Sequence, residues 1–222
     1  MRAILISKQK RLERSKARGS VLVEAALVIP LIFVPLALSV MVVGLNLIRA
    51  TSTNQLNRDA GHIFARGVDL SGSSNGLVNR GVLFHMAPAL QTTSASGTAV
   101  LVLSHIIYIA PTTCTTCPYT CSNCSNLSHA VFDKQITLGN AALRASSFGT
   151  VPGGSKDATS GIVSDPYGDS AVRADGVTTY LTLGVADGAP KDVYVSETYF
   201  SSADLFIAGI PGPPGVYARS FF

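Results

Sequence analysis

The chain has 222 residues, enough for one ordinary domain, and combines 47% hydrophobic with 14% charged residues. This composition excludes a disordered chain and favours a membrane-associated or exported protein. The net charge is +4, and the basic residues are concentrated in residues 1–19. This segment has seven basic residues and one acidic residue, a net charge of +6, so the rest of the chain carries −2. Nucleic-acid binding requires basic residues spread over a folded face, and this distribution argues against it.

Residues 20–48 are predicted to form a transmembrane helix. The 24 residues from Ala25 to Ile48 carry no charge. At the usual helical rise they extend about 36 Å, more than the roughly 30 Å hydrocarbon core of a bilayer. Spanning helices tolerate proline, so Pro30 and Pro35 do not contradict the prediction. The basic residues place 1–19 in the cytoplasm and everything after Arg49 outside it.

Two common kinds of N-terminal segment explain this region incompletely. A cleaved secretory signal has a shorter apolar region, followed by a small-x-small cleavage site that is missing here. An uncleaved signal anchor explains the length and the charge asymmetry, but not Gly19 or Glu24. Gly19 is followed by four residues that begin with Ser20, then by Glu24, and then by the apolar run.

This arrangement resembles the processing site of type IV prepilins and pseudopilins. The resemblance implies that a membrane-embedded aspartic peptidase, the prepilin peptidase, cuts after Gly19 on the cytoplasmic side. Residues 1–19 are then a basic leader that is removed, and Ser20 becomes the new N-terminus. Glu24 becomes the fifth residue of the mature chain, where the resemblance implies pairing with the terminal amine and a role in assembly and axial register.

Residues 18–38 read RGSVLVEAALVIPLIFVPLAL, which is similar to the N-terminus of TadE-like proteins, the pseudopilins of the tight-adherence (Tad, or Flp) pilus system. Residues 23–30 fit residue by residue, although Ala25 replaces a commoner aromatic residue. The resemblance covers about a third of the chain and does not separate TadE-like from TadF-like members. It implies a minor pilin in the bacterial inner membrane, with pilus subunits and assembly machinery as partners and a role in adhesion and biofilm formation.

The helix is predicted to continue from about Val21 to about Arg66, because apolar residues recur beyond the membrane at near-helical spacing. The extracytoplasmic domain, residues 49–222, shows a mixture of helix and strand patterns. We therefore predict an α+β fold in which the long helix packs on a small antiparallel sheet. The expected elements are a loop at 68–76, a short helix at 77–91 broken near Pro88, strands at 98–110, 130–139, 176–186 and 191–200, a last strand after 215, and a surface loop at 145–176.

The four cysteines, Cys114, Cys117, Cys121 and Cys124, fall within eleven residues. Outside the cytoplasm thiols are usually oxidised, so two disulfides are predicted, and the nested pairing of Cys114 with Cys124 and Cys117 with Cys121 suits a hairpin tip. The other two connectivities stay open. Two alternatives stay open: free thiols, and zinc binding by the loop within an uncleaved, membrane-anchored binding domain. Zinc sites, however, usually separate their two C-x-x-C pairs by a dozen or more residues.

No pattern in the sequence indicates catalysis. Residues 72–76 match G-x-S-x-G formally, but they lie among loop formers and not between a strand and a helix. The four histidines have no metal-ligand spacing, and there is no phosphate-binding or dinucleotide motif. The sequence thus predicts a non-enzymatic protein without a metal or a cofactor.

Overall fold

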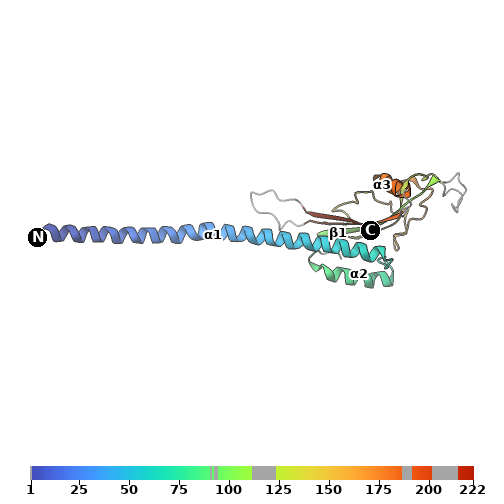
Figure 1. Cartoon of the computed structure of the whole chain (residues 1–222). Helices are drawn as coiled ribbons and strands as arrows, with labels where there is room; N and C mark the ends of the chain where they lie inside the picture. The colour runs from blue at the N-terminus through green and yellow to red at the C-terminus, as the bar shows by residue number, and fades with distance from the viewer. Residues whose placement is uncertain (1, 91, 93–94, 112–123, 187–191, 202–214) are drawn as a thin grey trace. The chain divides into compact units, whose positions relative to one another are not determined.

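The computed structural model describes residues 2–90, 92, 95–111, 124–186, 192–201 and 215–222. The chain is α+β: a long N-terminal helix and a small antiparallel sheet of four strands, as predicted. A compact folded unit begins at Ile48 (Figure 1). The elements are α1 (Arg2–Ala65), α2 (Ser74–Met86), η1 (Pro88–Leu90), β1 (Ala99–Tyr108), β2 (Ala130–Gly139), η4 (Ser170–Val172), α3 (Asp175–Ala186), β3 (Asp192–Phe200) and β4 (Val216–Phe221).

Helix α1 ends one residue before the predicted position, and it begins earlier, at Arg2. Its end is a Schellman cap formed by residues that the sequence places together. Gly67 has a φ of 77°, which glycine adopts without strain. The Gly67 N–H donates to the carbonyl of Phe64 (3.0 Å), and the Val68 N–H donates to that of Ile63 (3.2 Å). Carbonyls that a helix end would leave unpaired are thereby satisfied.

Helix α2 begins inside the predicted loop, and the G-x-S-x-G stretch forms its cap. The Ser73 hydroxyl accepts a hydrogen bond from the Gly76 N–H (3.0 Å) and donates one to Asp69 (2.5 Å). Hydrogen bonds from Ser73 and from Ser71 to the Asp69 carboxylate lower the pKa of Asp69 to about 2. The stretch follows a loop and not the strand that a nucleophile elbow requires. Its Ser73 is instead the N-cap of α2. The helix ends at Met86, just before Pro88, as predicted.

The sheet has the strand order β2-β1-β3-β4, and every neighbouring pair is antiparallel. The strands expected at 98–110, 130–139 and 191–200 and the strand expected after residue 215 are confirmed. The central strand, β1, is buried along most of its length. The pairing of β1 with β2 shifts register between His105 and Ile106, which leaves Asp133 as the extra residue of a β-bulge.

The strand predicted at 176–186 is wrong, because this segment forms α3. The β-branched residues of the segment favour a strand locally. Val177 and Leu181, one helical turn apart, are however 3% and 7% exposed, whereas Tyr180 is 74% exposed. In a strand, Thr179 would share a face with Val177 and Leu181, but Thr179 is exposed, as the helical period requires.

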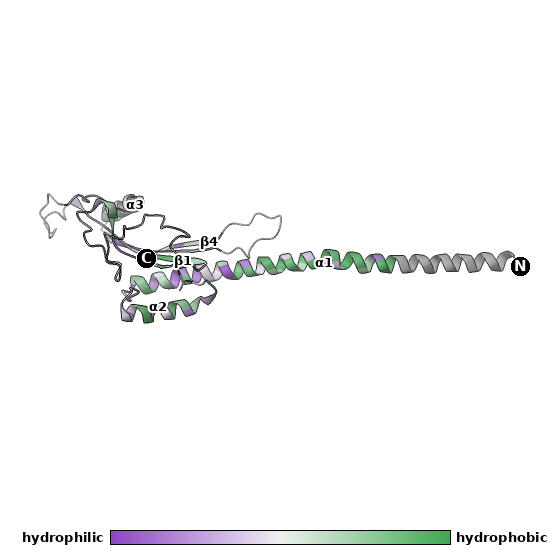
Figure 2. Ribbon diagram, turned by 180° about the vertical axis from the view of Figure 1, so that it is seen from behind, coloured by the Kyte–Doolittle hydropathy of each residue, from purple (hydrophilic) through white to green (hydrophobic). Residues whose placement is uncertain are grey.

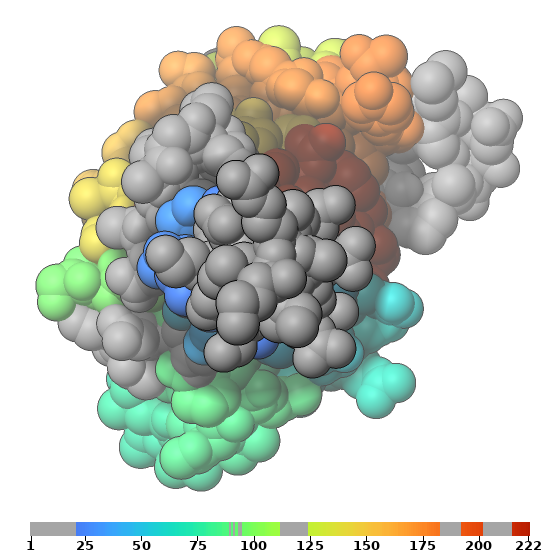
Figure 3. Space-filling view, turned by 90° about the vertical axis from the view of Figure 1, so that its left-hand side faces the viewer, coloured from blue at the N-terminus to red at the C-terminus, as the bar shows by residue number. Residues whose placement is uncertain are grey.

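Two apolar clusters lie on opposite faces of the sheet. On one face, side chains from the second half of α1, from α2 and from the strands form a cluster that includes Leu56, Phe64, Leu83, Leu101 and Phe200. On the other face, α3 and the segment 145–176 cover Phe132 and Ile106. That segment was predicted as a surface loop, but three of its valines are buried: Val151, Val163 and Val172. Figure 3 shows α2 (teal to green) and α3 (orange) on opposite sides of the folded unit.

Asn57 of α1 is the polar centre of the contact between this helix and the sheet. Its side chain is 1% exposed. The Asn57 carbonyl oxygen accepts hydrogen bonds from the hydroxyls of Ser196 (2.9 Å) and Thr198 (3.1 Å) on β3. Its amide donates to the Ser220 hydroxyl on β4 (2.9 Å). One side chain therefore satisfies two buried hydroxyls on β3, bonds a half-buried one on β4, and fixes how the helix lies on these strands.

Asn57→Ala should lower the free energy of unfolding by roughly 2–4 kcal/mol, because it leaves buried hydroxyls without partners and opens a small cavity. Chemical denaturation of the detergent-solubilised full chain measures the effect. Asn54→Ala is the matched control: Asn54 lies one turn earlier on α1 and is exposed, so its loss should change stability by less than about 0.5 kcal/mol. Equal effects of the two substitutions would contradict the assigned role of Asn57.

Candidate functional site

Residues 21–48 of α1 expose apolar side chains on all sides. Among the described residues, they belong to the one helix that is long and apolar enough to cross a membrane, and none of the apolar segment is buried. Figure 2 shows this as a nearly continuous hydrophobic colour that becomes mixed further along α1. A helix that is apolar all round is stable in a bilayer and not in water. This supports a single-pass membrane anchor.

The predicted processing and assembly residues lie at the start of this segment. Gly19 and Ser20 are in helical backbone, and Glu24 is exposed and surrounded by exposed apolar residues. Ser20 and Glu24 are four residues apart, so they are neighbours on one face of the helix. A new amino group at Ser20 would therefore lie within one turn of the Glu24 carboxylate. An unpaired carboxylate at a membrane edge is costly, and such an amine would offset that cost.

The cysteine-rich loop connects two paired strands, β1 and β2, as the hairpin prediction required. Cys124 is 6% exposed, and no free cysteine occurs among the described residues. Cys114, Cys117 and Cys121 lie outside these residues. The two disulfides and their connectivity therefore stay a prediction. The described part of the chain holds no group of three side chains placed to bind a metal ion. The zinc alternative concerns the cysteine-rich loop, most of which lies outside that part.

His105 forms an ionisable site that the sequence analysis did not recognise. The ring nitrogens lie 2.9 Å from a carboxylate oxygen of Asp133 and 3.2 Å from one of Asp192. The ring also stacks on Tyr194, with the centroids 4.3 Å apart. Strand pairing brings these groups together, since Asp133 belongs to the bulge of β2 and Asp192 opens β3. No local pattern reveals the site, because its members are far apart in the sequence.

The two carboxylates favour the charged form of His105. Burial alone lowers the pKa of this histidine, but the hydrogen bonds and charges of Asp133 and Asp192 outweigh burial, so the pKa is raised above its ordinary value. The physical reason is that both nitrogens of an imidazolium donate, whereas a neutral ring turns one lone pair toward a carboxylate. Protonated His105 thus ties together three strands at one end of the sheet.

Comparison of the chain with protein-family models, with curated proteins and with solved structures found no match.

Stability should fall as pH rises through the raised pKa of His105. The protonated form is favoured in the folded state, so its stabilisation is complete below the unfolded pKa of about 6.5 and disappears above the folded one. Thermal unfolding of the full chain from about pH 5 to about pH 8 measures this decline. His105→Gln should flatten the decline, whereas His85→Gln, at an exposed position of α2, should preserve it. An unchanged pH dependence in His105→Gln would contradict the assignment.

Proposed function

We propose that this chain is a TadE-like minor pilin or pseudopilin, a structural component in the assembly of a Tad (Flp-type) pilus. The observation that carries the proposal is the exposed apolar helix of α1, which directly follows the Gly19-x4-Glu24 pattern and a leader with a net charge of +6. Neither an ordinary signal anchor nor a soluble helix requires a glycine and a glutamate at these positions. The role that follows is structural, in bacterial adhesion and biofilm formation.

The proposed topology divides the chain into three parts. Residues 1–19 lie in the cytoplasm and are removed by the prepilin peptidase. Residues 20–48 span the bacterial inner membrane. Residues 49–222 form an extracytoplasmic α+β domain, in which the cysteine-rich loop meets an oxidising environment. The concentration of basic residues before the apolar segment supports this orientation.

The exposed anchor helix supplies the surface for assembly with other pilin subunits. Its side chains from Val21 to Ile48 have few partners within the chain, so they are available to lipid and to neighbouring anchor helices. Within such a bundle, the Glu24 carboxylate pairs with the amine of Ser20 on its own or a neighbouring chain. This pairing offsets the desolvation of both charges and favours one axial register over its alternatives.

Coexpression with a prepilin peptidase should yield a mature chain that begins at Ser20. N-terminal sequencing and intact mass of the membrane-extracted protein measure this, because loss of residues 1–19 is visible in both. Gly19→Leu should block cleavage, since the peptidase must accept the residue before the cut. Gly44→Ala is the matched control: a methyl group at Gly44 meets nothing within 4 Å, so processing should be normal.

Retention of Met1 in the presence of an active peptidase would refute the pilin proposal. It would favour an uncleaved anchor that carries an extracytoplasmic binding domain. Zinc bound by the purified chain with all four thiols reduced would assign metal binding to the cysteine loop of that domain. Disulfide-linked peptides in a nonreducing digest would instead support the predicted disulfides.

Glu24→Ala should leave membrane insertion and cleavage intact but reduce incorporation into pilin complexes several-fold, because the amine at Ser20 loses its partner. Co-purification with tagged pilus subunits measures incorporation, and alkaline extraction of membranes measures insertion. Asp59→Ala is the control, because it removes a carboxylate from the same helix beyond the membrane segment. Normal co-purification of Glu24→Ala would show that Glu24 does not set the register.

A further inference from the structure

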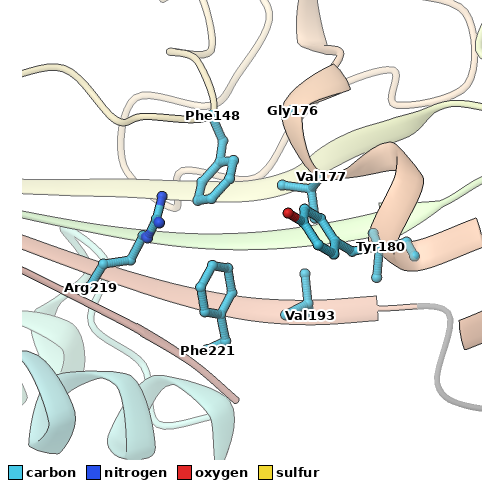
Figure 4. Close-up of a pocket in the computed structure, with 8 residues that line it drawn as sticks. Phe148, Gly176, Val177, Tyr180, Val193, Arg219 and Phe221 are labelled. Atoms are coloured by element: carbon cyan, nitrogen blue, oxygen red, sulfur yellow. The ribbon is translucent and has the colours of Figure 1, made fainter. Parts of the chain in front are cut away.

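An apolar cavity of about 500 Å³ opens beside the last strand of the sheet. Figure 4 shows side chains from β3, β4, α3 and the segment before it pointing toward one another around this opening. Phe148, Val177, Val193 and Phe221 supply apolar walls, and Tyr180 stands at the rim. Phe221 is 52% exposed, although large aromatic side chains usually bury more of their surface. The cavity is large enough for one aromatic side chain with room to spare.

Strand β4 borders the cavity and has an unpaired edge. Tyr194 and Phe222 exchange both of their backbone hydrogen bonds (3.1 and 2.9 Å). In an antiparallel ladder every second residue makes such a pair, so the backbone groups of Tyr217, Arg219 and Phe221 point away from β3. Within the described part of the chain, no backbone group bonds to them there. The side chains of the same three residues lie on the face of the cavity.

Arg219 places an unpaired positive charge at this edge. Its guanidinium lies 5.2 Å from the ring centroid of Phe148 and 5.3 Å from that of Phe221, so both rings hold it in place. Glu197 is its cross-strand neighbour, but that carboxylate already accepts from the Ser147 N–H (3.0 Å) and the Tyr217 hydroxyl (2.5 Å). No ion pair of Arg219 occurs among the described residues.

We propose that β4 is a docking edge for an extended segment of another polypeptide, which carries an acidic residue opposite Arg219 and an aromatic residue two positions away. The segment adds a fifth strand and takes its backbone hydrogen bonds from Tyr217, Arg219 and Phe221. Its acidic side chain pairs with Arg219, and its aromatic side chain enters the cavity. The period of two in a strand places both side chains on the same face. The inference does not depend on the proposed processing of the anchor.

A second copy of this chain fits the edge poorly. Symmetric pairing of two β4 strands about Arg219 would bring two guanidinium groups directly opposite each other, and like charges in that position are destabilising. An acidic segment instead neutralises the charge at the edge. Charge complementarity therefore favours a different partner over self-association.

The probe is the fluorescent peptide acetyl-Thr-Phe-Thr-Glu-Thr-Val-Thr-amide, titrated against the full-length chain in nanodiscs, with empty nanodiscs as the background. Saturable binding is expected in the micromolar range, because the interface is far smaller than a standard one. A peptide with Gln in place of Glu should bind roughly tenfold more weakly, since it loses a charged hydrogen bond. A peptide with Phe and Glu adjacent should also bind weakly, because its two anchors face opposite sides.

N-methylation of the probe tests for strand addition. Methyl groups on the amides of Phe, Glu and Val should abolish binding, because these amides face β4. Methyl groups on the intervening Thr amides should be tolerated, because they face away. If the cavity bound the aromatic ring without strand addition, the two sets of N-methylated peptides would bind equally well, and this result would contradict the proposed strand addition.

Variants of the chain test the charge. Arg219→Gln should weaken binding of the acidic probe roughly tenfold, and Arg219→Glu should instead bind a probe with Lys in place of Glu. Arg58→Gln removes an exposed charge from α1 and should have no effect. Thermal unfolding checks that each variant is folded. No saturable binding, equal binding of the acidic and Gln probes, or an Arg219→Gln variant that binds normally would each overturn the proposal.

Discussion

The change of surroundings along α1 constrains the whole molecule. Residues 21–48 of the helix expose apolar side chains on every side, which is stable in a bilayer and not in water. In its second half one face is buried, and Asn57 pairs there with hydroxyls of β3 and β4. A polar side chain that is buried and satisfied this way tolerates few alternative helix positions. One element therefore combines a segment that could span a membrane with part of the folded core.

The sheet needs cover on two faces, and the chain supplies it from different regions. Residues near the start, in α1 and α2, cover one face, and residues 145–181 cover the other. The chain end contributes too: Phe222 packs against His62 of α1, with ring centroids 4.5 Å apart. A methyl group at Gly61 would come within 2.0 Å of the Phe222 ring, so the absence of a side chain there permits the contact.

The ionisable groups of the folded unit are used in two different ways. His105 is held between Asp133 and Asp192 and stabilises one end of the sheet. Arg219 is held between two aromatic rings beside an unpaired strand edge, and it forms no ion pair within the described residues. A charge that a protein orients without pairing it is a natural contact for a partner of opposite charge. The folded unit thereby gains a candidate role of its own, besides that proposed for the apolar helix.

The sequence alone determined the features that depend on neighbouring residues. The apolar run and the helical spacing beyond it predicted α1 from about Val21 to about Arg66, and stretches of strand-forming residues between turn formers located β1, β2, β3 and β4. The tertiary structure decided what depends on residues far apart. Residues 176–186 form a helix, which buries Val177 and Leu181 one turn apart and leaves Thr179 and Tyr180 exposed. The sites around His105 and Arg219 exist only because strands distant in sequence pair in one register, which brings their charges and rings together.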